Sequence, residues 1–278
     1  MIDAYLDESG IHDGAAVCVI AGYFGGRGQW RKLEQAWKQA LNEFDVPMEK
    51  FHAKELYPKP TGFFRHHWDT SRHEPFLQRL AAAVADCGKI NPVGFGVIVE
   101  DFFSYSENVR KFFTGANMKD GQPTTLGCPN KPYFLPFQRC LVRVCEYAPI
   151  GGKAHFFFGL DRPFAGYANE LFAQIKSTTV QPEIKRRLGD PSFPLAKETP
   201  QLQAADLLTH LTYHYMLDTH RQNVIGQIQP FPLLATCIRN RRANEDFGFF
   251  DKTMMRENLI LAAEVSRQLK ESIKEPKP

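Results

Sequence analysis

Two kinds of hydrophobic pattern alternate along this chain, and together they predict an α/β fold. Residues 2–6 and 15–24 are rich in β-branched and aromatic side chains and flank a glycine-containing stretch, which predicts a hairpin with a wide connection. Over residues 28–44, apolar side chains recur every three or four positions, which predicts an amphipathic helix. Because strands and helices continue to alternate, we expect a sheet with helices on both faces.

The remaining elements are expected in the same alternation. Strands are predicted over residues 92–103, 153–161 and 193–199, and helices over residues 74–87, 133–148, 165–176, 201–217 and 230–240. Two polar stretches without periodicity, residues 48–72 and 104–131, are read as insertions. A single domain is therefore expected over residues 1–278.

Composition places the chain among ordinary globular proteins. Hydrophobic residues make up 43% and charged residues 23%, and the net charge of +3 permits a polyanionic partner without requiring one. No apolar run approaches the roughly 18 residues of a membrane span, so no membrane association is expected. The six cysteines form no CxxC pair and no signal-peptide pattern is present, which predicts reduced thiols and a cytoplasmic location.

Three aspartates fall at positions that converge in such a fold. Asp7 ends the first strand, Asp161 ends a late strand, and Asp206 lies in the first turns of the last long helix. Adjacent strand ends at the centre of an α/β sheet are where sites are built. Two carboxylates about 4 Å apart repel by roughly 4 kcal/mol at an effective dielectric constant of about 20. If the three aspartates converge, they therefore cannot all stay ionised without a bound cation or a raised pKa. Oxygen ligands of this kind predict Mg²⁺ or Mn²⁺ and phosphoryl chemistry.

Two further patterns concern the surroundings of these aspartates. Strand alternation puts Asp7 and Glu8 on opposite faces, so both reach one point only if the strand breaks there. A polar stripe runs along the last long helix, at helical spacing. Its members are Gln203, Asp206, His210 and His214. Such a stripe is more often the solvated side of a helix, although Lys and Glu usually cover that side.

Short motifs resemble those of the DUF3800 family of bacteria and their phages. They are "YLDESG" at residues 5–10, "LQAADLL" at residues 202–208 and "FHAKEL" at residues 51–56. The resemblance spans residues 2–215 and implies a ribonuclease H-like mixed sheet flanked by helices. One departure is that the usual fold has three antiparallel strands before its first helix, whereas here the helix at 28–44 precedes the third strand.

The resemblance also implies roles for individual residues. Asp7, Asp161 and Asp206 would be the metal-binding acidic residues. Glu8 would be a further ligand or would only hold the turn, and His52 would shuttle protons. The supporting residues would be Ser9, Glu55 and Gln203. Apart from the resemblance, the position of Lys197 and Glu198 just before Pro200 makes them candidates, Lys197 for a phosphate and Glu198 as a further ligand, with plain surface charges as the alternative. For Gln203 the alternatives are capping its helix or hydrogen-bonding a ligand carboxylate.

The function expected from these features is that of a metal-dependent nuclease acting on RNA or DNA. A catalytically silent module that binds nucleic acid or a protein is the alternative, and hydrolysis of a small phosphate ester would use the same ligands. Zinc is disfavoured because the histidines of residues 52–73 lack zinc-finger spacing. The basic runs at 185–187 and 239–242 are candidate phosphate contacts or plain solvated surface. The sequence leaves the oligomeric state open.

Overall fold

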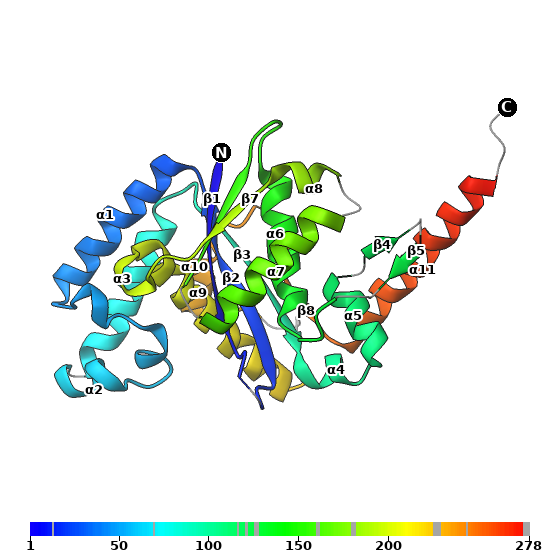
Figure 1. Ribbon diagram of the computed structural model, residues 1–278. Helices are drawn as coiled ribbons and strands as arrows, with labels where there is room; N and C mark the ends of the chain where they lie inside the picture. Colours follow the sequence, from blue (N-terminus) through cyan, green and yellow to red (C-terminus); the bar gives the residue numbers. More distant parts are fainter. Residues whose placement is uncertain are drawn as a thin grey trace.

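A six-stranded mixed sheet in the order β7–β6–β1–β2–β3–β8 forms the centre of the computed structural model (Figure 1). Its strands are β1 Ile2–Ser9, β2 Val17–Gly25, β3 Asn91–Ile98, β6 Ala154–Phe158, β7 Leu188–Ser192 and β8 Phe247–Phe250. The structure describes residues 1–278 except 13, 69, 116, 120–121, 125–127, 160–161, 179–181, 225–228, 243 and 275–278. The expected α/β class with a mixed sheet is confirmed.

Strand β1 lies inside the sheet and sets its mixed character. It pairs antiparallel with β2 and parallel with β6, and β2 pairs antiparallel with β3. Every residue of β2 and β3 is buried, which explains why these strands consist of apolar and small residues.

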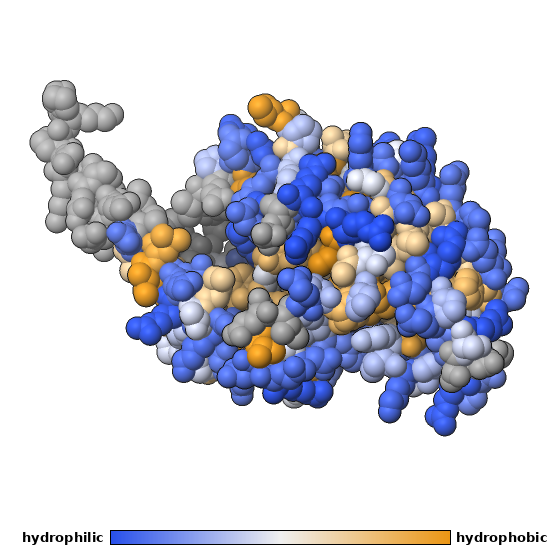
Figure 2. Space-filling model, turned by 180° about the vertical axis from the view of Figure 1, so that it is seen from behind, coloured by the Kyte–Doolittle hydropathy of each residue, from blue (hydrophilic) through white to orange (hydrophobic). Residues whose placement is uncertain are grey.

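Helices cover both faces of the sheet (Figure 1). One face carries α1 Arg27–Glu43, α3 His73–Ala85, α9 Pro200–Arg221 and α10 Pro232–Cys237, and the other carries α6 Phe134–Tyr147 and α7 Arg162–Thr178. Each layer closes a separate hydrophobic core. Hydrophilic residues cover most of the face shown in Figure 2, since the large apolar side chains lie in these cores.

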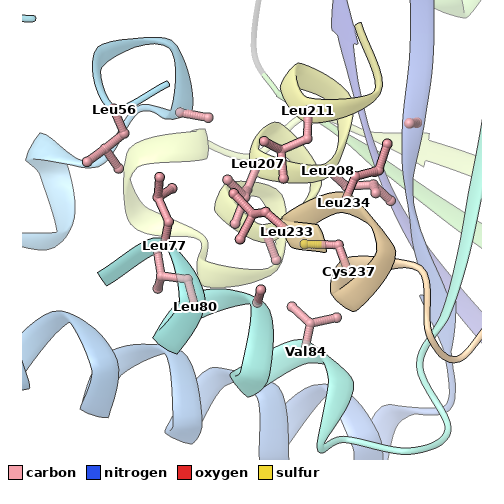
Figure 3. Close-up of a cluster of buried hydrophobic side chains, with 14 of the residues drawn as sticks. Leu56, Leu77, Leu80, Val84, Leu207, Leu208, Leu211, Leu233, Leu234 and Cys237 are labelled. Atoms are coloured by element: carbon pink, nitrogen blue, oxygen red, sulfur yellow. The ribbon is translucent and has the colours of Figure 1, made fainter. Parts of the chain in front are cut away.

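Helix α9 connects the sheet to the helices outside it. Figure 3 shows leucines of α9 meeting those of α3 and α10. On the sheet side, Thr209 Oγ1 donates a hydrogen bond to the carbonyl oxygen of Ala21 at 2.9 Å and to that of Asp7 at 3.4 Å. This contact fixes α9 along β1 and β2, with Asp206 one turn earlier.

Several sequence expectations differ from the structure. The strand expected over residues 193–199 is wrong: β7 ends at Ser192, and η4 Ala196–Glu198 follows. The neighbouring strand β6 ends at Phe158, directly after the Phe157–Ser192 pair, so β7 has no strand to continue along. The basic run 185–187 belongs to α8 Pro182–Arg187 and not to a loop. Neither β8 nor α11 Lys252–Lys274 was expected, and the four residues of β8 are too few for a period-two pattern.

The two expected insertions contain short elements. Residues 48–72 form η1 Met48–Lys50, η2 Ala53–Glu55, α2 Gly62–His67 and η3 Thr70–Arg72. Between β3 and α6 lie α4 Val99–Phe103, α5 Glu107–Gly115 and the paired strands β4 Asn117–Lys119 and β5 Gln122–Thr124. In the described part of the chain, no helix has the length and hydrophobicity to cross a membrane.

The packing of α9 predicts a large effect for one leucine. Leu208 is fully buried, so Leu208→Ala should lower the free energy of unfolding by about 2–5 kcal/mol, from lost burial and a residual cavity. Leu195→Ala is the control, because Leu195 is 42% exposed and its loss should change stability by about 0.5 kcal/mol or less. Urea unfolding of both variants measures the difference, and equal losses would contradict the packing.

Candidate functional site

A cleft of about 970 Å³ lies where β1 ends, and residues from four parts of the chain line it. They are Asp7, Glu8, Glu49, Lys50, Phe51, His52, Glu55, Gly62, Phe63, His66, Gly159, Ala196, Lys197, Gln203 and Asp206. The structure therefore brings together most of the residues predicted for the site, although they come from opposite ends of the sequence.

Asp7 and Glu8 both line the cleft without a break in β1. Asp7 pairs with Ala21 and Glu8 with Ile20, so their side chains start on opposite faces, as alternation requires. The pairing of β1 with β6 ends at Leu6, so the edge of β1 is open beside both carboxylates. The expectation that they could meet only at a strand break is therefore wrong: the neighbouring strand ends instead.

Gly159 keeps space beside Asp7 at this open edge. It directly follows β6, and a Cβ placed on it would come within 3.7 Å of both Asp7 Oδ1 and the Cβ of Ala196. A longer side chain at this position would therefore extend into the space next to the Asp7 carboxylate. The glycine leaves that carboxylate accessible from the cleft.

The electrostatics of Asp7 are unfavourable to its charged form. Burial, the charge of Glu8 and then the charge of Asp206 raise the Asp7 pKa well above its ordinary value, and a side-chain hydrogen bond with Glu8 adds to the shift. The two adjacent carboxyl groups therefore favour holding a proton between them. A cation bound at this place would relieve the same repulsion.

Asp206 joins the cleft to the 48–72 segment. Its Oδ2 accepts a hydrogen bond from the backbone N–H of Ala53 at 2.9 Å and lies 3.1 Å from His52 Nδ1. The Asp206 side chain is 18% exposed and that of His52 is 46% exposed, so the imidazole has one side on Asp206 and the other on the open cleft. This geometry suits a group that exchanges protons with a bound molecule.

The polar stripe of α9 is covered by the 48–72 segment and is not a solvated face. Gln203 Nε2 donates to the carbonyl oxygen of Met48 at 2.8 Å. Two turns further along α9, His210 Nε2 lies 2.7 Å from the carbonyl oxygen of Tyr57, and the His214 ring is 5.3 Å from the Tyr57 ring. Together with Asp206, these contacts fasten the irregular segment along α9.

Gln203 has contacts different from both roles expected for it. Its Oε1 accepts a hydrogen bond from Trp37 Nε1 at 2.9 Å, and its Nε2 also donates to the carbonyl oxygen of Lys197 at 3.3 Å. The amide is 2% exposed and connects α1, η1 and η4. It is therefore a buried brace that joins these elements at the wall of the cleft.

Glu55 also has a structural contact. Its Oε2 accepts a hydrogen bond from the Phe63 N–H at 3.1 Å, at the start of α2. Gly62 has a φ of 51°, and a Cβ there would lie 2.2 Å from Glu55 Oε2. Only glycine fits this turn, so Glu55 and Gly62 shape the outer wall of the cleft together.

The other predicted residues divide into three groups. Lys197 lines the cleft, whereas Ser9 and Glu198 are described but do not line it. Asp161 lies outside the described residues. The described residues of the two basic runs do not line the cleft, and within those runs Arg187 donates to the carbonyl oxygen of Cys145 and Arg242 to Asn91 Oδ1.

Sequence reasoning missed Glu49, Lys50 and Phe63 as residues of the cleft. All three belong to the irregular 48–72 segment, where no periodicity predicts which way a side chain points. The polar stripe of α9 could have indicated that a segment covers this helix, because polar side chains that are not solvated need a polar partner. That partner is the backbone of this segment.

The ligand chemistry of the cleft matches a hard divalent cation. Among the residues that the structure describes, no three or more His, Cys, Asp or Glu side chains form a ready-made metal site. Asp7, Glu8 and Asp206 nevertheless supply the carboxylate oxygens that Mg²⁺ and Mn²⁺ prefer, and the repulsion among them already raises the Asp7 pKa. Binding of an ion would have to draw the three groups together.

Comparison with known proteins does not extend this description. No protein-family model, no curated protein and no solved structure matches the chain.

The contact between α9 and the 48–72 segment predicts a pH dependence of stability. Burial and the neighbouring His210 lower the His214 pKa from 6.5 to about 4. Because the folded protein favours the neutral ring, this stability is present above pH 6.5 and is lost as the pH falls towards about 4. Thermal unfolding of His214→Gln should therefore depend less on pH over this window than that of the wild type.

The exposed His12 provides the control for this measurement. His12→Gln removes an exposed histidine, and the change in pH dependence caused by His214→Gln is measured against it. An unchanged pH dependence in His214→Gln would show that the buried ring does not contribute to it.

Proposed function

We propose that the protein is a metal-dependent phosphodiester hydrolase that acts on RNA or DNA. The observation that carries this proposal is the convergence of the Asp7, Glu8 and Asp206 carboxylates on one cleft, which raises the Asp7 pKa. Paired carboxylates with a raised pKa and an open face are typical of catalytic centres.

The residues of the cleft have separate roles in this proposal. Asp7, Glu8 and Asp206 would hold Mg²⁺ or Mn²⁺ through carboxylate oxygens. When bound, such an ion lowers the pKa of water and neutralises charge on a phosphate. His52, which lies 3.1 Å from Asp206 and is open to the cleft, delivers a proton to the leaving oxygen.

The arrangement of the sheet supports the ribonuclease H-like part of the proposal. Three neighbouring antiparallel strands, β1, β2 and β3, are followed by β6 on the other side of β1, and α9 carries an acidic residue to the end of β1. The departure expected from the sequence is present, because α1 and α3 lie between β2 and β3. Membership of the DUF3800 family and a ligand role for Asp161 remain predictions.

A catalytically silent module is the second candidate, and a specific observation favours it. Asp206 Oδ2 already accepts the Ala53 N–H at 2.9 Å, and no ready-made metal group occurs within the described ranges. In that case the three carboxylates would serve only to position the 48–72 segment, and the cleft would bind its partner without cleaving it.

Asp7→Asn separates the two candidates. In the proposed enzyme it should lower Mn²⁺-dependent cleavage of a single-stranded RNA or DNA by about 100-fold or more, because a ligand of the ion is lost. The same variant should unfold at no lower temperature than the wild type in the presence of a chelator, since the amide removes the charge that burial and Glu8 disfavour.

Asp3→Asn is the matched control, because Asp3 lies on the same face of β1 but does not line the cleft. It should retain wild-type cleavage. Undiminished cleavage by Asp7→Asn would contradict the proposed enzyme, and absence of cleavage and of Mn²⁺ binding in the wild type would favour the silent module.

A further inference from the structure

Two lysines lie on neighbouring turns at one edge of the cleft. Lys50 belongs to η1 and Lys197 to η4, and these two turns lie side by side although they are far apart in the sequence. Both side chains line the cleft and both residues are exposed. Within the described part of the chain, neither ammonium group is paired with a carboxylate.

The buried side chain of Gln203 fixes the two turns relative to each other. Its Nε2 donates to the carbonyl oxygens of Met48 in η1, at 2.8 Å, and of Lys197 in η4, at 3.3 Å. Trp37 Nε1 donates to its Oε1 at 2.9 Å, which fixes the orientation of the amide. The separation of the two lysine backbones is therefore set by the hydrophobic core and does not depend on a mobile loop.

The two ammonium groups lie beside a centre of opposite charge. Asp7, Glu8 and Asp206 alone would repel a phosphate, so an anionic substrate needs cations in the same cleft. An ammonium group binds phosphate as a point charge. The cleft of 970 Å³ lies near the upper end of ordinary ligand sites, which range from about 300 to about 1,000 Å³, and has room for more than one phosphate.

We propose that Lys50 and Lys197 bind a phosphate next to the one that is cleaved, so that the substrate is a phosphodiester chain and not an ester with a single phosphate. Gln203 is the positioning residue of this pair. The inference rests on the proposed function, because it assumes that the scissile phosphate lies at the Asp7, Glu8 and Asp206 carboxylates. It extends that function by naming the two residues that bind the chain beside the scissile phosphate, which distinguishes a polynucleotide from an ester with a single phosphate.

Binding tests this inference without catalysis. The probe is a fluorescently labelled single-stranded oligonucleotide in the presence of a chelator, with fluorescence anisotropy as the readout. Lys50→Gln and Lys197→Gln should each weaken binding about tenfold and reduce the salt slope of log Kd by about 0.7. Lys54→Gln is the matched control, since Lys54 is exposed on the same segment but does not line the cleft.

Hydrolysis with Mn²⁺ tests the substrate class. In the two lysine variants, KM for the oligonucleotide should rise about tenfold, whereas hydrolysis of bis(p-nitrophenyl) phosphate, which has one phosphate, should stay at the wild-type rate. Equal losses on both substrates, or no loss on either, would overturn the inference. Lysine-dependent binding without any hydrolysis would refute the proposed function and the inference that rests on it, whereas hydrolysis of the oligonucleotide that does not depend on the two lysines would refute the inference alone.

Gln203→Met tests the positioning role. It should raise KM for the oligonucleotide as the lysine variants do while retaining hydrolysis of the single-phosphate ester. A purely structural role would lower both activities together. If this buried variant does not fold, the two surface lysine variants still decide the inference.

Discussion

The position of α9 on the sheet is the interaction on which the rest of the structure depends. Its apolar side closes the core between the sheet, α3 and α10, and Thr209 ties it to the backbone of β1 and β2. Its polar side fastens the irregular 48–72 segment through Gln203, Asp206 and His210. One helix therefore closes the core, places an acidic residue at the end of β1 and holds the segment that forms the outer wall of the cleft.

The cleft concentrates negative charge where water is partly excluded. Asp7 is half-buried beside Glu8 in the same cleft as Asp206, and desolvation and these two charges raise its pKa well above its ordinary value. A protein gains no stability from such an arrangement, because removing the charge would relieve both desolvation and repulsion. Sites that oppose stability in this way are common where a ligand completes the charge balance, and in the proposed function that ligand is a cation.

The sequence predicted elements whose period extends over many residues, such as α1 and the strands before and after it. It also placed Asp7 and Asp206 near one another, because strand ends and the first turns of a long helix have defined positions. His52 was expected near them only from the resemblance of its motif. The sequence could not predict how Glu8 reaches the cleft, since that depends on where the neighbouring strand β6 ends. It also could not predict that Lys50 lines the cleft, because a segment without periodicity takes its shape from the helix on which it packs.

The most direct test of this account is a crystal of the protein soaked with Mn²⁺, with the anomalous difference density measured at the cleft. The account predicts one or two strong peaks within coordination distance of Asp7, Glu8 and Asp206, and none there in crystals of Asp7→Asn. No peak in the cleft, or a peak held only by residues outside these three carboxylates, would contradict the metal-dependent function.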